Sequence, residues 1–416
     1  MKNKKKRRPI RFRLASLALI AAASACFHPR PPTVDAIELV ESVPVETGLD
    51  NADLRNTADV WCEMIRSARE TIEMGQFYYA HRPGETLDRV ILELAAAARR
   101  GVPIRCLADS RMSATYPILL DALRHMPGVS VRLIDFAALA GGTHHAKYII
   151  VDGETVFIGS PNFDWRSLTH IHELGLRIRD RRLAAVYRRI FEMDWRLAGG
   201  QSRESVLGEL AAKVEPAFEV SSKRYGRVSL QPTASPMSLI PDPSLWDETR
   251  IGRLLSEARR EICLQFLSYS PVGRDSSPYV ALDGALRRAA GRGVRVRLLV
   301  ADWQKGTPAE RALKDLAAVP NIEVRFSVIP EWSGGYIPYA RVEHCKFVLV
   351  DGGKFWLGTS NGEKSYFHDS RNLGLIVDSA PMAQRLRRVF YKSWDGGTAE
   401  AVDPARTYSP RRHGEE

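Results

Sequence analysis

The chain has 416 residues, of which 44% are hydrophobic and 26% are charged. This composition excludes a low-complexity or disordered chain, and the length allows two domains with sizeable cores. A formal net charge of +11 would favour a nucleic-acid partner, but residues 1–25 hold eight lysines and arginines and no acid, so the body carries only +3.

Residues 1–25 are typical of an export signal, because a basic start precedes the short apolar run LASLALIAAASA. Ala23-Ser24-Ala25 fits a cleavage site, and Cys26 follows at once, as in bacterial lipoproteins. We expect an exported bacterial protein, either periplasmic or anchored to the membrane as a lipoprotein through Cys26. Simple secretion and an uncleaved anchor stay open. Residues 26–35 then form a short, stiff tether.

Helices and apolar strands alternate along the next part of the chain. We expect helices at 57–70, 86–100 and 181–196, strands at 71–79, 103–108 and 129–134, and β-rich runs near 146–152, 154–159 and 172–179. A further helix should precede the strand at 129–134. This alternation predicts an α/β fold with mixed sheets.

The second half of the chain repeats the first. RGVPIRCLAD (100–109) resembles RGVRVRLLVAD (292–302), and HAKYIIVD (145–152) matches HCKFVLVD (344–351), with the order of the matched segments kept. We therefore predict a duplicated domain. Its parts are a first domain at 36–197, a linker at 198–224, a second domain at 225–396 and a polar tail at 397–416.

One motif occurs in both copies with identical spacing, His-x-Lys-x4-Asp-x6-Gly-[Ser/Thr]-x-Asn. The first copy holds His145, Lys147, Asp152, Gly159, Ser160 and Asn162, and the second holds His344, Lys346, Asp351, Gly358, Thr359 and Asn361. On a strand, residues i and i+2 share a face, so each histidine projects together with its lysine. A pseudo-twofold pairing of the halves would bring both pairs into one pocket.

Such a pocket has the groups that a phosphodiester reaction needs. One imidazole attacks phosphorus and the other protonates the leaving oxygen, while the lysines neutralise charge on the equatorial oxygens. We therefore expect no metal and no cofactor. We assign phosphate binding to Lys147, Lys346, Asn162, Asn361, Ser160 and Thr359, and we count Asp152 and Asp351 among the catalytic residues.

At these residues the sequence resembles the phospholipase D superfamily, whose mark is this HKD motif. The flanks NFDWRSLTHIHELG and GTSNGEKSYFHDSRNLG resemble the branch that contains the mammalian lysosomal phospholipase-D-like 5′ exonucleases and related poxviral envelope proteins. The resemblance covers roughly residues 36–396. It implies a covalent phosphohistidine that water or an alcohol resolves, and two α/β halves packed about a pseudo-twofold with one shared active site.

The copies differ at one position. Glu173 follows His145 by 28 residues, and Asn372 stands at the same distance after His344. A carboxylate on an imidazole Nδ1–H makes the ring a better nucleophile, and the family often keeps an acid beside its nucleophilic histidine. We therefore expect Glu173 to pair with His145, which makes His145 the nucleophile and His344 the general acid. The alternative is that Glu173 pairs with a nearby arginine.

Other residues receive plainer interpretations. Cys62, Cys106, Cys263 and Cys345 lack zinc-site spacing and are expected to be buried, although a disulfide stays open. His144, His170 and His172 do not form a convincing metal cluster. Aromatic residues gather near both motifs, and part of the loop PEWSGGYIPYAR is expected to face the substrate.

Three functions remain open. The first, which we favour, is a metal-independent phospholipase D-type phosphodiesterase that hydrolyses or transfers phospholipids, acts near a membrane surface and is a monomer with both motifs in one chain. The second is a 5′ exonuclease on single-stranded nucleic acid. The third is a non-catalytic membrane-associated protein that keeps the fold, although both motifs are intact.

Overall fold

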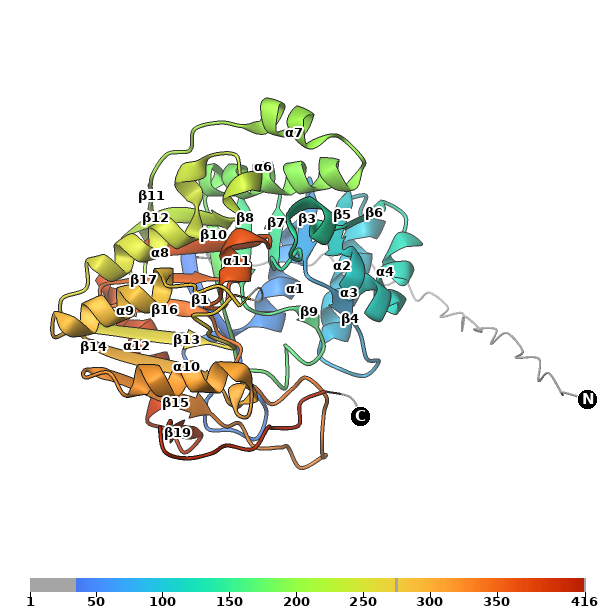
Figure 1. Ribbon diagram of the computed structural model, residues 1–416. Coiled ribbons are helices and arrows are strands. Elements are labelled where there is room, and N and C mark those ends of the chain that lie inside the picture. Colours follow the sequence, from blue (N-terminus) through green and yellow to red (C-terminus); the bar gives the residue numbers. More distant parts are fainter. Residues whose placement is uncertain (1–34, 274–275, 415–416) are drawn as a thin grey trace, which may run out of the picture. The chain divides into compact units, whose positions relative to one another are not determined.

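Two large mixed sheets carry the fold, one from each half of the chain (Figure 1). The computed structural model describes residues 35–273 and 276–414. The first sheet has the strand order β2-β1-β10-β8-β7-β3-β5-β6. Its strands are β1 (Ile37–Ser42), β2 (Arg55–Asn56), β3 (Ile72–Gln76), β5 (Ile104–Asp109), β6 (Val129–Ile134), β7 (Tyr148–Val151), β8 (Thr155–Gly159) and β10 (Glu173–Arg179).

The second sheet has the order β11-β12-β18-β17-β16-β13-β14-β15-β19. Its strands are β11 (Phe218–Ser222), β12 (Gly226–Ser235), β13 (Glu261–Phe266), β14 (Arg295–Ala301), β15 (Ile322–Ser327), β16 (Phe347–Val350), β17 (Lys354–Gly358), β18 (Asn372–Asp378) and β19 (Ala399–Ala401). The run from β12 to β15 repeats the run from β1 to β6 in the first sheet, which confirms the predicted duplication. The short strands β4 (Tyr79–Ala80) and β9 (Phe163–Asp164) pair separately.

Helices cover the sheets, and most of the longer ones are amphipathic. They are α1 (Thr57–Ser67), α2 (Leu87–Arg99), α3 (Ser110–Thr115), α4 (Pro117–Arg124), α5 (Phe136–Ala140), α6 (Arg181–Ala198), α7 (Arg203–Leu210), α8 (Asp247–Ser256), α9 (Ala281–Gly291), α10 (Pro308–Ala317), α11 (Lys364–His368) and α12 (Ala380–Trp394). Local sequence sets several ends. The side chain of Asn56 caps α1, and that of Asp180 caps α6.

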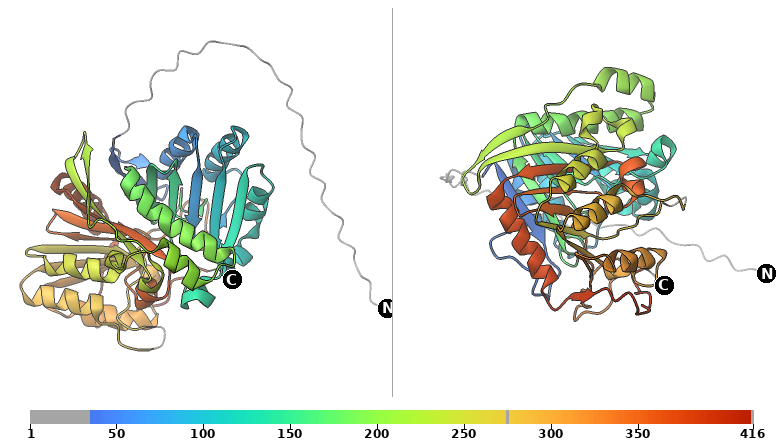
Figure 2. Two further views of the ribbon diagram at one scale, coloured as in Figure 1. Left: turned by 90° about the horizontal axis from the view of Figure 1, so that it is seen from above. Right: turned by 60° about the vertical axis from the view of Figure 1, so that its left-hand side comes forward.

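The apolar core has three main clusters. Helices α1, α2 and α4 pack on one face of the first sheet, and α8, α9 and α10 pack on one face of the second. Helices α6 and α12 share a third cluster with the opposite faces of both sheets. Figure 2 shows α6, in green, on the face of the first sheet opposite to the blue and cyan helices. The two α/β halves are therefore joined through a common inner core.

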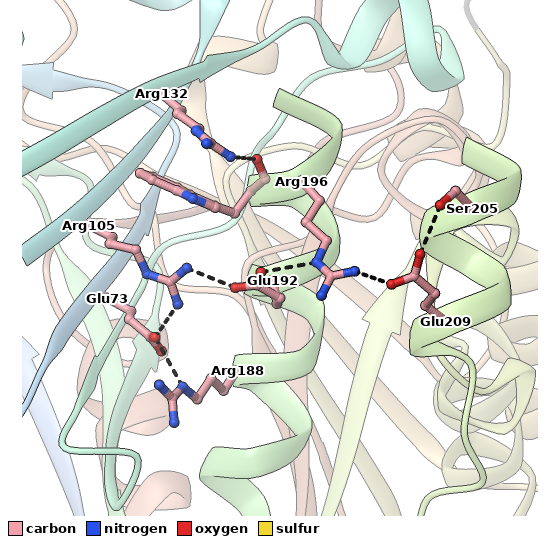
Figure 3. Close-up of polar contacts among 9 residues, drawn as sticks. Glu73, Arg105, Arg132, Arg188, Glu192, Arg196, Ser205 and Glu209 are labelled. Carbon is pink, nitrogen blue, oxygen red and sulfur yellow. Dashed lines mark hydrogen bonds and ion pairs between the residues drawn. The ribbon is translucent and has the colours of Figure 1, made fainter. Parts of the chain in front are cut away.

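Charged side chains reinforce the α6 face of the first sheet (Figure 3). Arg105 on β5 donates to the buried carboxylate of Glu73 at 2.5 Å and to Glu192 of α6 at 2.8 Å. The network of ion pairs extends to α7 through Arg196, which donates to Glu209 at 2.6 Å. The second half repeats the buried centre of this network with Glu261, Arg297 and Arg387.

Two segments differ from the predicted organisation. The expected linker at 198–224 contains α7, which Figure 3 shows tied to α6, and the edge strand β11 of the second sheet. The expected polar tail at 397–416 contributes β19, which pairs with β15. Hydrophobic periodicity missed both because α7 buries only Val206 and an edge strand carries few apolar residues.

The predictions for the N-terminus lie outside the described residues. They concern the export signal at 1–25, lipidation of Cys26 and most of the tether at 26–35. Within residues 35–273 and 276–414, no helix combines the length and the apolar character that crossing a bilayer requires. The four other cysteines are buried and free, in line with the interpretation as small hydrophobic residues.

Candidate active site

The two motif segments meet where the halves of the chain contact each other. Strand β7 begins directly after Lys147, and β16 begins directly after Lys346. Just before these strands, the backbone N–H of His145 donates to the carbonyl of Arg371 at 3.0 Å, and that of His344 donates to the carbonyl of His172 at 3.0 Å. Each motif is thus bonded to the segment that leads into the corresponding strand of the other half.

Both motif histidines line one cavity of about 510 Å³, together with Asn162. The rest of its wall is largely aromatic and aliphatic, and both halves of the chain contribute to it. The structure therefore brings His145 and His344 to a single site, as the duplicated motif predicts.

The lysines lie beneath the histidines. The Nζ of Lys147 donates to the carbonyl of His145 at 2.5 Å, and the Nζ of Lys346 donates to the carbonyl of His344 at 2.6 Å. Both ammonium groups are fully buried, which is costly unless an anion compensates for the lost hydration. An anionic phosphate in the cavity would supply that compensation.

The motif asparagines also have side-chain polar atoms that are free to bond a polar ligand. Within the described residues, the buried Oδ1 of Asn162 and both side-chain polar atoms of Asn361 have no hydrogen-bond partner. Buried polar atoms without partners are rare in proteins and call for an explanation. The two lysine donors and the unpartnered Nδ2 donor of Asn361 suit the oxygens of a phosphate, whereas the two Oδ1 atoms can accept only from a donor group on the ligand.

The two histidines have chemically different partners. The Nδ1 of His344 lies 2.8 Å from Oε2 of Glu173, whereas the Nδ1 of His145 lies 3.1 Å from Oδ1 of Asn372. The expected pairing of Glu173 with His145 is therefore wrong, and so is the alternative pairing with an arginine. Glu173 begins β10 of the first half, but that strand end faces the histidine of the second half. The sequence separation of 28 residues is the same in both copies and does not reveal this crossing.

The asparagine partner is held in one orientation. Asn372 donates from Nδ2 to the carbonyl of Tyr366 at 2.8 Å, and its Oδ1 accepts from Oγ1 of Thr359 at 2.8 Å. The carbonyl oxygen of its amide therefore faces His145, whose Nδ1 is the protonated nitrogen. In both histidines this leaves Nε2 for the chemistry.

Burial dominates the electrostatics of the site. It lowers the pKa of His344 and of His145 well below the ordinary value, and the two buried lysines lower both further. Burial also lowers the pKa of Lys346 to about 8. It raises the pKa of Glu173 to about 7, against the opposing effect of Lys346. Both imidazoles are thus neutral at pH 7 before an anionic substrate binds.

Ser160 and Thr359 do not line the cavity. Ser160 accepts from the N–H of Leu174 at 3.0 Å, and Thr359 accepts from the N–H of Leu373 at 3.1 Å. Their hydroxyls therefore anchor the strands that carry Glu173 and Asn372. The preceding Gly159 allows this close approach, because a Cβ there would lie 2.5 Å from the Cα of Gly175. Both hydroxyls thus have a supporting role within the protein, and their contact with a phosphate stays a prediction.

Asp152 and Asp351 lie away from the site. The carboxylate of Asp152 accepts from the backbone N–H groups of residues 69–71, between α1 and β3. Asp351 accepts from those of residues 259–261. The reason is the length of the strand, since five residues from Lys147 to Asp152 span about 17 Å at ~3.3 Å each. The catalytic assignment of both aspartates is therefore wrong, and their role is structural.

Replacing Asp152 with alanine is expected to lower the free energy of unfolding by about 1–2 kcal/mol, because three backbone donors lose a charged acceptor. Asp152→Asn is the matched variant, since asparagine keeps an acceptor and tolerates the positive φ of 54° at this position. Urea denaturation measures the difference. A strong loss of turnover with unchanged stability would place Asp152 in the reaction after all.

The sequence anticipated part of the aromatic wall. Tyr339, from the loop expected to face the substrate, lines the cavity, and so does Tyr366. Phe367 instead belongs to the core, and Trp165 lines a second, smaller cavity. The wall residues that the sequence analysis missed are Phe77, Tyr78, Tyr116 and Trp303. Phe77, Tyr78 and Trp303 directly follow the parallel strands β3 and β14, and Tyr116 ends the short helix α3 that follows β5, so position at the carboxyl edge of a sheet is the signal that could have found them.

One buried group among the described residues has the chemistry of metal ligands. Potential ligand atoms of His172, Glu343 and Cys345 lie within 4.8 Å of one another. The Nδ1 of His172 and Oε2 of Glu343 are 2.8 Å apart and already form a hydrogen bond. The group is fully buried behind the pair formed by His344 and Glu173, and none of its members lines the cavity.

Comparison with known proteins identifies the family. The family described as "Cardiolipin synthase, PLD-like domain" matches residues 61–195 and 251–394. The 5'-3' exonuclease PLD3 of Bos taurus is 31% identical over 409 residues, which cover 90% of this chain and 82% of that protein. Phospholipase D Z of Dictyostelium discoideum is 28% identical, over 86% of this chain and 89% of that protein.

The fold has relatives among solved structures as well. Phosphatidylserine synthase of Haemophilus influenzae superposes with a TM-score of 0.59, at 13% sequence identity, over 83% of this chain and 85% of that one. At this identity the likeness concerns the fold alone. With two matched domains, one in each half, and with relatives that span nearly the whole chain, the protein belongs to the phospholipase D-like superfamily of phosphodiesterases.

Proposed function

We propose that this protein is a metal-independent phosphodiesterase that works through a phosphohistidine on His344. The observation that carries the proposal is the difference between the two histidine partners, a carboxylate on His344 and a neutral amide on His145. The carboxylate stabilises positive charge on the ring it contacts and so makes His344 the better nucleophile. The amide does not, so protonated His145 is the better proton donor.

The reaction then has two balanced steps. The Nε2 of His344 attacks phosphorus, the bond from phosphorus to the leaving oxygen breaks, and His145 gives its Nε2 proton to that oxygen. In the second step His145 takes a proton from water or an alcohol. The resulting oxygen attacks phosphorus, and the phosphorus–nitrogen bond to His344 breaks. Lys147 and Lys346 offset the negative charge that the phosphoryl oxygens carry in both transition states.

As substrate we propose the 5′ end of single-stranded nucleic acid. Six rings contribute to the cavity wall, from Phe77, Tyr78, Tyr116, Trp303, Tyr339 and Tyr366. Aromatic side chains stack on bases of any sequence, at about 1–3 kcal/mol per base. The name of the relative from Bos taurus points the same way, because it is a 5'-3' exonuclease.

A phospholipid is the second candidate. The relative from Dictyostelium discoideum is named a phospholipase D, and no lysine or arginine is among the described residues that line the cavity, which suits an apolar substrate. The expected lipid anchor at Cys26 favoured this substrate from the sequence. A membrane-associated, monomeric protein with one complete site per chain would fit either candidate.

One pair of assays separates the two substrates. The purified protein is given a single-stranded oligonucleotide labelled at its 3′ end and, separately, phospholipid vesicles with a labelled head group. Stepwise shortening of the oligonucleotide, with a closed single-stranded circle left intact, is the expected result. Head-group release with untouched DNA would favour the second candidate, and cleavage of the circle would contradict attack at an end. The His344→Ala variant is the negative control for each assay.

Turnover is expected to survive metal chelation. Two buried lysines supply the positive charge that a divalent cation would otherwise bring to the phosphoryl oxygens. The rate in EDTA should therefore equal the rate without it, for an aryl phosphodiester and for an oligonucleotide alike. A loss that a divalent ion restores would contradict the mechanism and direct attention to the group formed by His172, Glu343 and Cys345.

The pH dependence should differ between leaving groups. Glu173, with a pKa of about 7, becomes ionised as the pH rises and strengthens His344 as a nucleophile. With an aryl phosphodiester, whose leaving group needs no proton, kcat/KM should rise to a plateau above about pH 7. With an alkyl phosphodiester kcat/KM should instead fall as the pH rises through the lowered pKa of His145, on the acid side of the ordinary imidazole value, because the ring loses its proton there. Parallel profiles for the two substrates would contradict the division of roles.

A further inference from the structure

The last described residues of the chain run from the edge of the second sheet to the wall of the catalytic cavity. Strand β19 pairs with β15, and Tyr408 is buried against Phe326, with ring centroids 5.2 Å apart. This anchorage fixes where the following residues lie. The segment Arg411–Gly414, which we call the C-terminal strap, then contacts two separate parts of the cavity wall.

The first contact is with the turn that carries Trp303. Arg411 forms an ion pair with the buried Asp302, the residue before this tryptophan, and donates to the carbonyl of Ile329 at 2.7 Å. The imidazole of His413 stacks on the indole of Trp303, with centroids 4.7 Å apart and planes inclined by 20°. One face of the indole is therefore covered by the strap, while Trp303 also lines the cavity.

The second contact is with the loop that carries Tyr339. The N–H of Tyr339 donates to the carbonyl of His413 at 2.7 Å, and the hydroxyl of Tyr336 donates to the carbonyl of Gly414 at 2.7 Å. Tyr339 has a φ of 58° and Arg341 a φ of 54°, a region that side chains other than glycine adopt only when surrounding contacts hold them. The bond to the strap is one of those contacts.

The surface on which the strap begins fits the chain closely. Gly306 has a φ of 68°, and a Cβ at this position would lie 2.5 Å from Pro410. Any larger residue at position 306 would push the chain away just before the strap begins. The strap therefore lies on its own closely fitting surface of the second half, separate from the residues that react.

We propose that the C-terminal strap sets substrate specificity by positioning Trp303 and Tyr339, with His413 as the positioning residue that contacts both. This proposal depends on the proposed function in one respect only, because it takes the cavity as the site where the substrate binds. The strap does not touch the motif histidines, so it acts on the binding of the part of the substrate that lies against the rings. A substrate too small to reach those rings is insensitive to the strap.

The test compares four proteins: a chain that ends at Pro410, His413→Ala, His413→Phe and Arg406→Ala. Arg406 is the matched control, since it belongs to the same tail and contacts Glu400 and the face of the Tyr408 ring without touching the wall. For the oligonucleotide, the truncated chain and His413→Ala should raise KM about 10-fold with kcat nearly unchanged, the size of one lost stacking contact. For bis(p-nitrophenyl) phosphate both constants should stay close to wild type. His413→Phe keeps a ring and should behave as wild type.

Hydrogen exchange supplies a readout that does not depend on the substrate. The amide of Tyr339 should exchange at least about 10-fold faster in the truncated chain and at the wild-type rate in Arg406→Ala, because only the truncation removes its acceptor. Unchanged exchange and unchanged KM would overturn the proposal, and so would equal losses of kcat on both substrates. If the wild-type protein leaves oligonucleotides intact, the proposed substrate fails, while the exchange result still decides on the strap.

Discussion

His344→Ala is expected to abolish turnover, with a loss on the order of 10⁴- to 10⁶-fold for every phosphodiester, because His145, the other imidazole at the cavity, lacks the carboxylate partner that makes His344 the nucleophile. No phosphorylated protein should accumulate in this variant. The expected result follows from the contact between His344 and the buried Glu173. Initial rates with an aryl and an alkyl phosphodiester measure it.

His145→Ala is the matched comparison, and its expected signature is different. The aryl substrate should still phosphorylate the protein, whereas turnover of the alkyl substrate should fall by about 10²- to 10⁴-fold, the range for a lost general acid. His368→Ala, at an exposed histidine that pairs with Glu248, controls for the loss of an imidazole as such. Equal losses on both substrates in His145→Ala would contradict its role as the acid.

Glu173→Gln is expected to lower the rate by about 10²- to 10⁴-fold on aryl and alkyl substrates alike. Glutamine keeps an oxygen that can accept from His344 but lacks the negative charge, so the variant isolates the electrostatic part of the contact. It should also remove the rise of aryl kcat/KM toward pH 7, because the group whose pKa burial raises to about 7 is gone. Steady-state rates between pH 5 and 9 provide the measurement.

Asn372→Asp is the corresponding change in the residue that contacts the other histidine, His145. A carboxylate there would hold the proton on His145 more strongly and make the ring a weaker acid toward a poor leaving group. The alkyl substrate should therefore slow, while the aryl substrate should be nearly unaffected. If Glu173→Gln spared the aryl substrate and Asn372→Asp accelerated it, the roles of the two histidines would be exchanged.

The sequence was sufficient to predict the fold and the centre of the site. Two copies of one motif in matched places of a duplicated α/β pattern required that His145 and His344 meet, and the structure places both at one cavity. The strands near 103–108, 129–134 and 172–179 were also found, because their apolar runs are bounded by charged residues or glycine.

The sequence could not reveal which motif histidine each of the two partner residues contacts. Glu173 and Asn372 occupy equivalent positions, so their identities are readable, but only the packing of the halves shows that each contacts the histidine of the other copy. The motif aspartates were misplaced for a simpler reason. Strand length alone puts Asp152 at the far end of β7 from Lys147, and that estimate was available from the spacing.

The contacts that hold the aromatic wall in place could not be predicted, for a third reason. Trp303 is brought to the cavity by a turn after β14 and held there by residues that follow it by more than a hundred positions. No local pattern connects two such segments. Long-range contacts of this kind depend on the whole sheet being formed, which is why the residues 397–416 were expected to be only a polar tail.

The central claim is that the covalent intermediate forms on His344, and mapping the phosphorylated residue tests it most directly. The wild-type protein is mixed with an aryl phosphodiester, quenched within milliseconds, kept at alkaline pH to preserve the phosphorus–nitrogen bond, digested and analysed by mass spectrometry. We expect the phosphoryl group on the peptide that contains His344, and it should disappear in His344→Ala. An adduct on the peptide that contains His145 would contradict it.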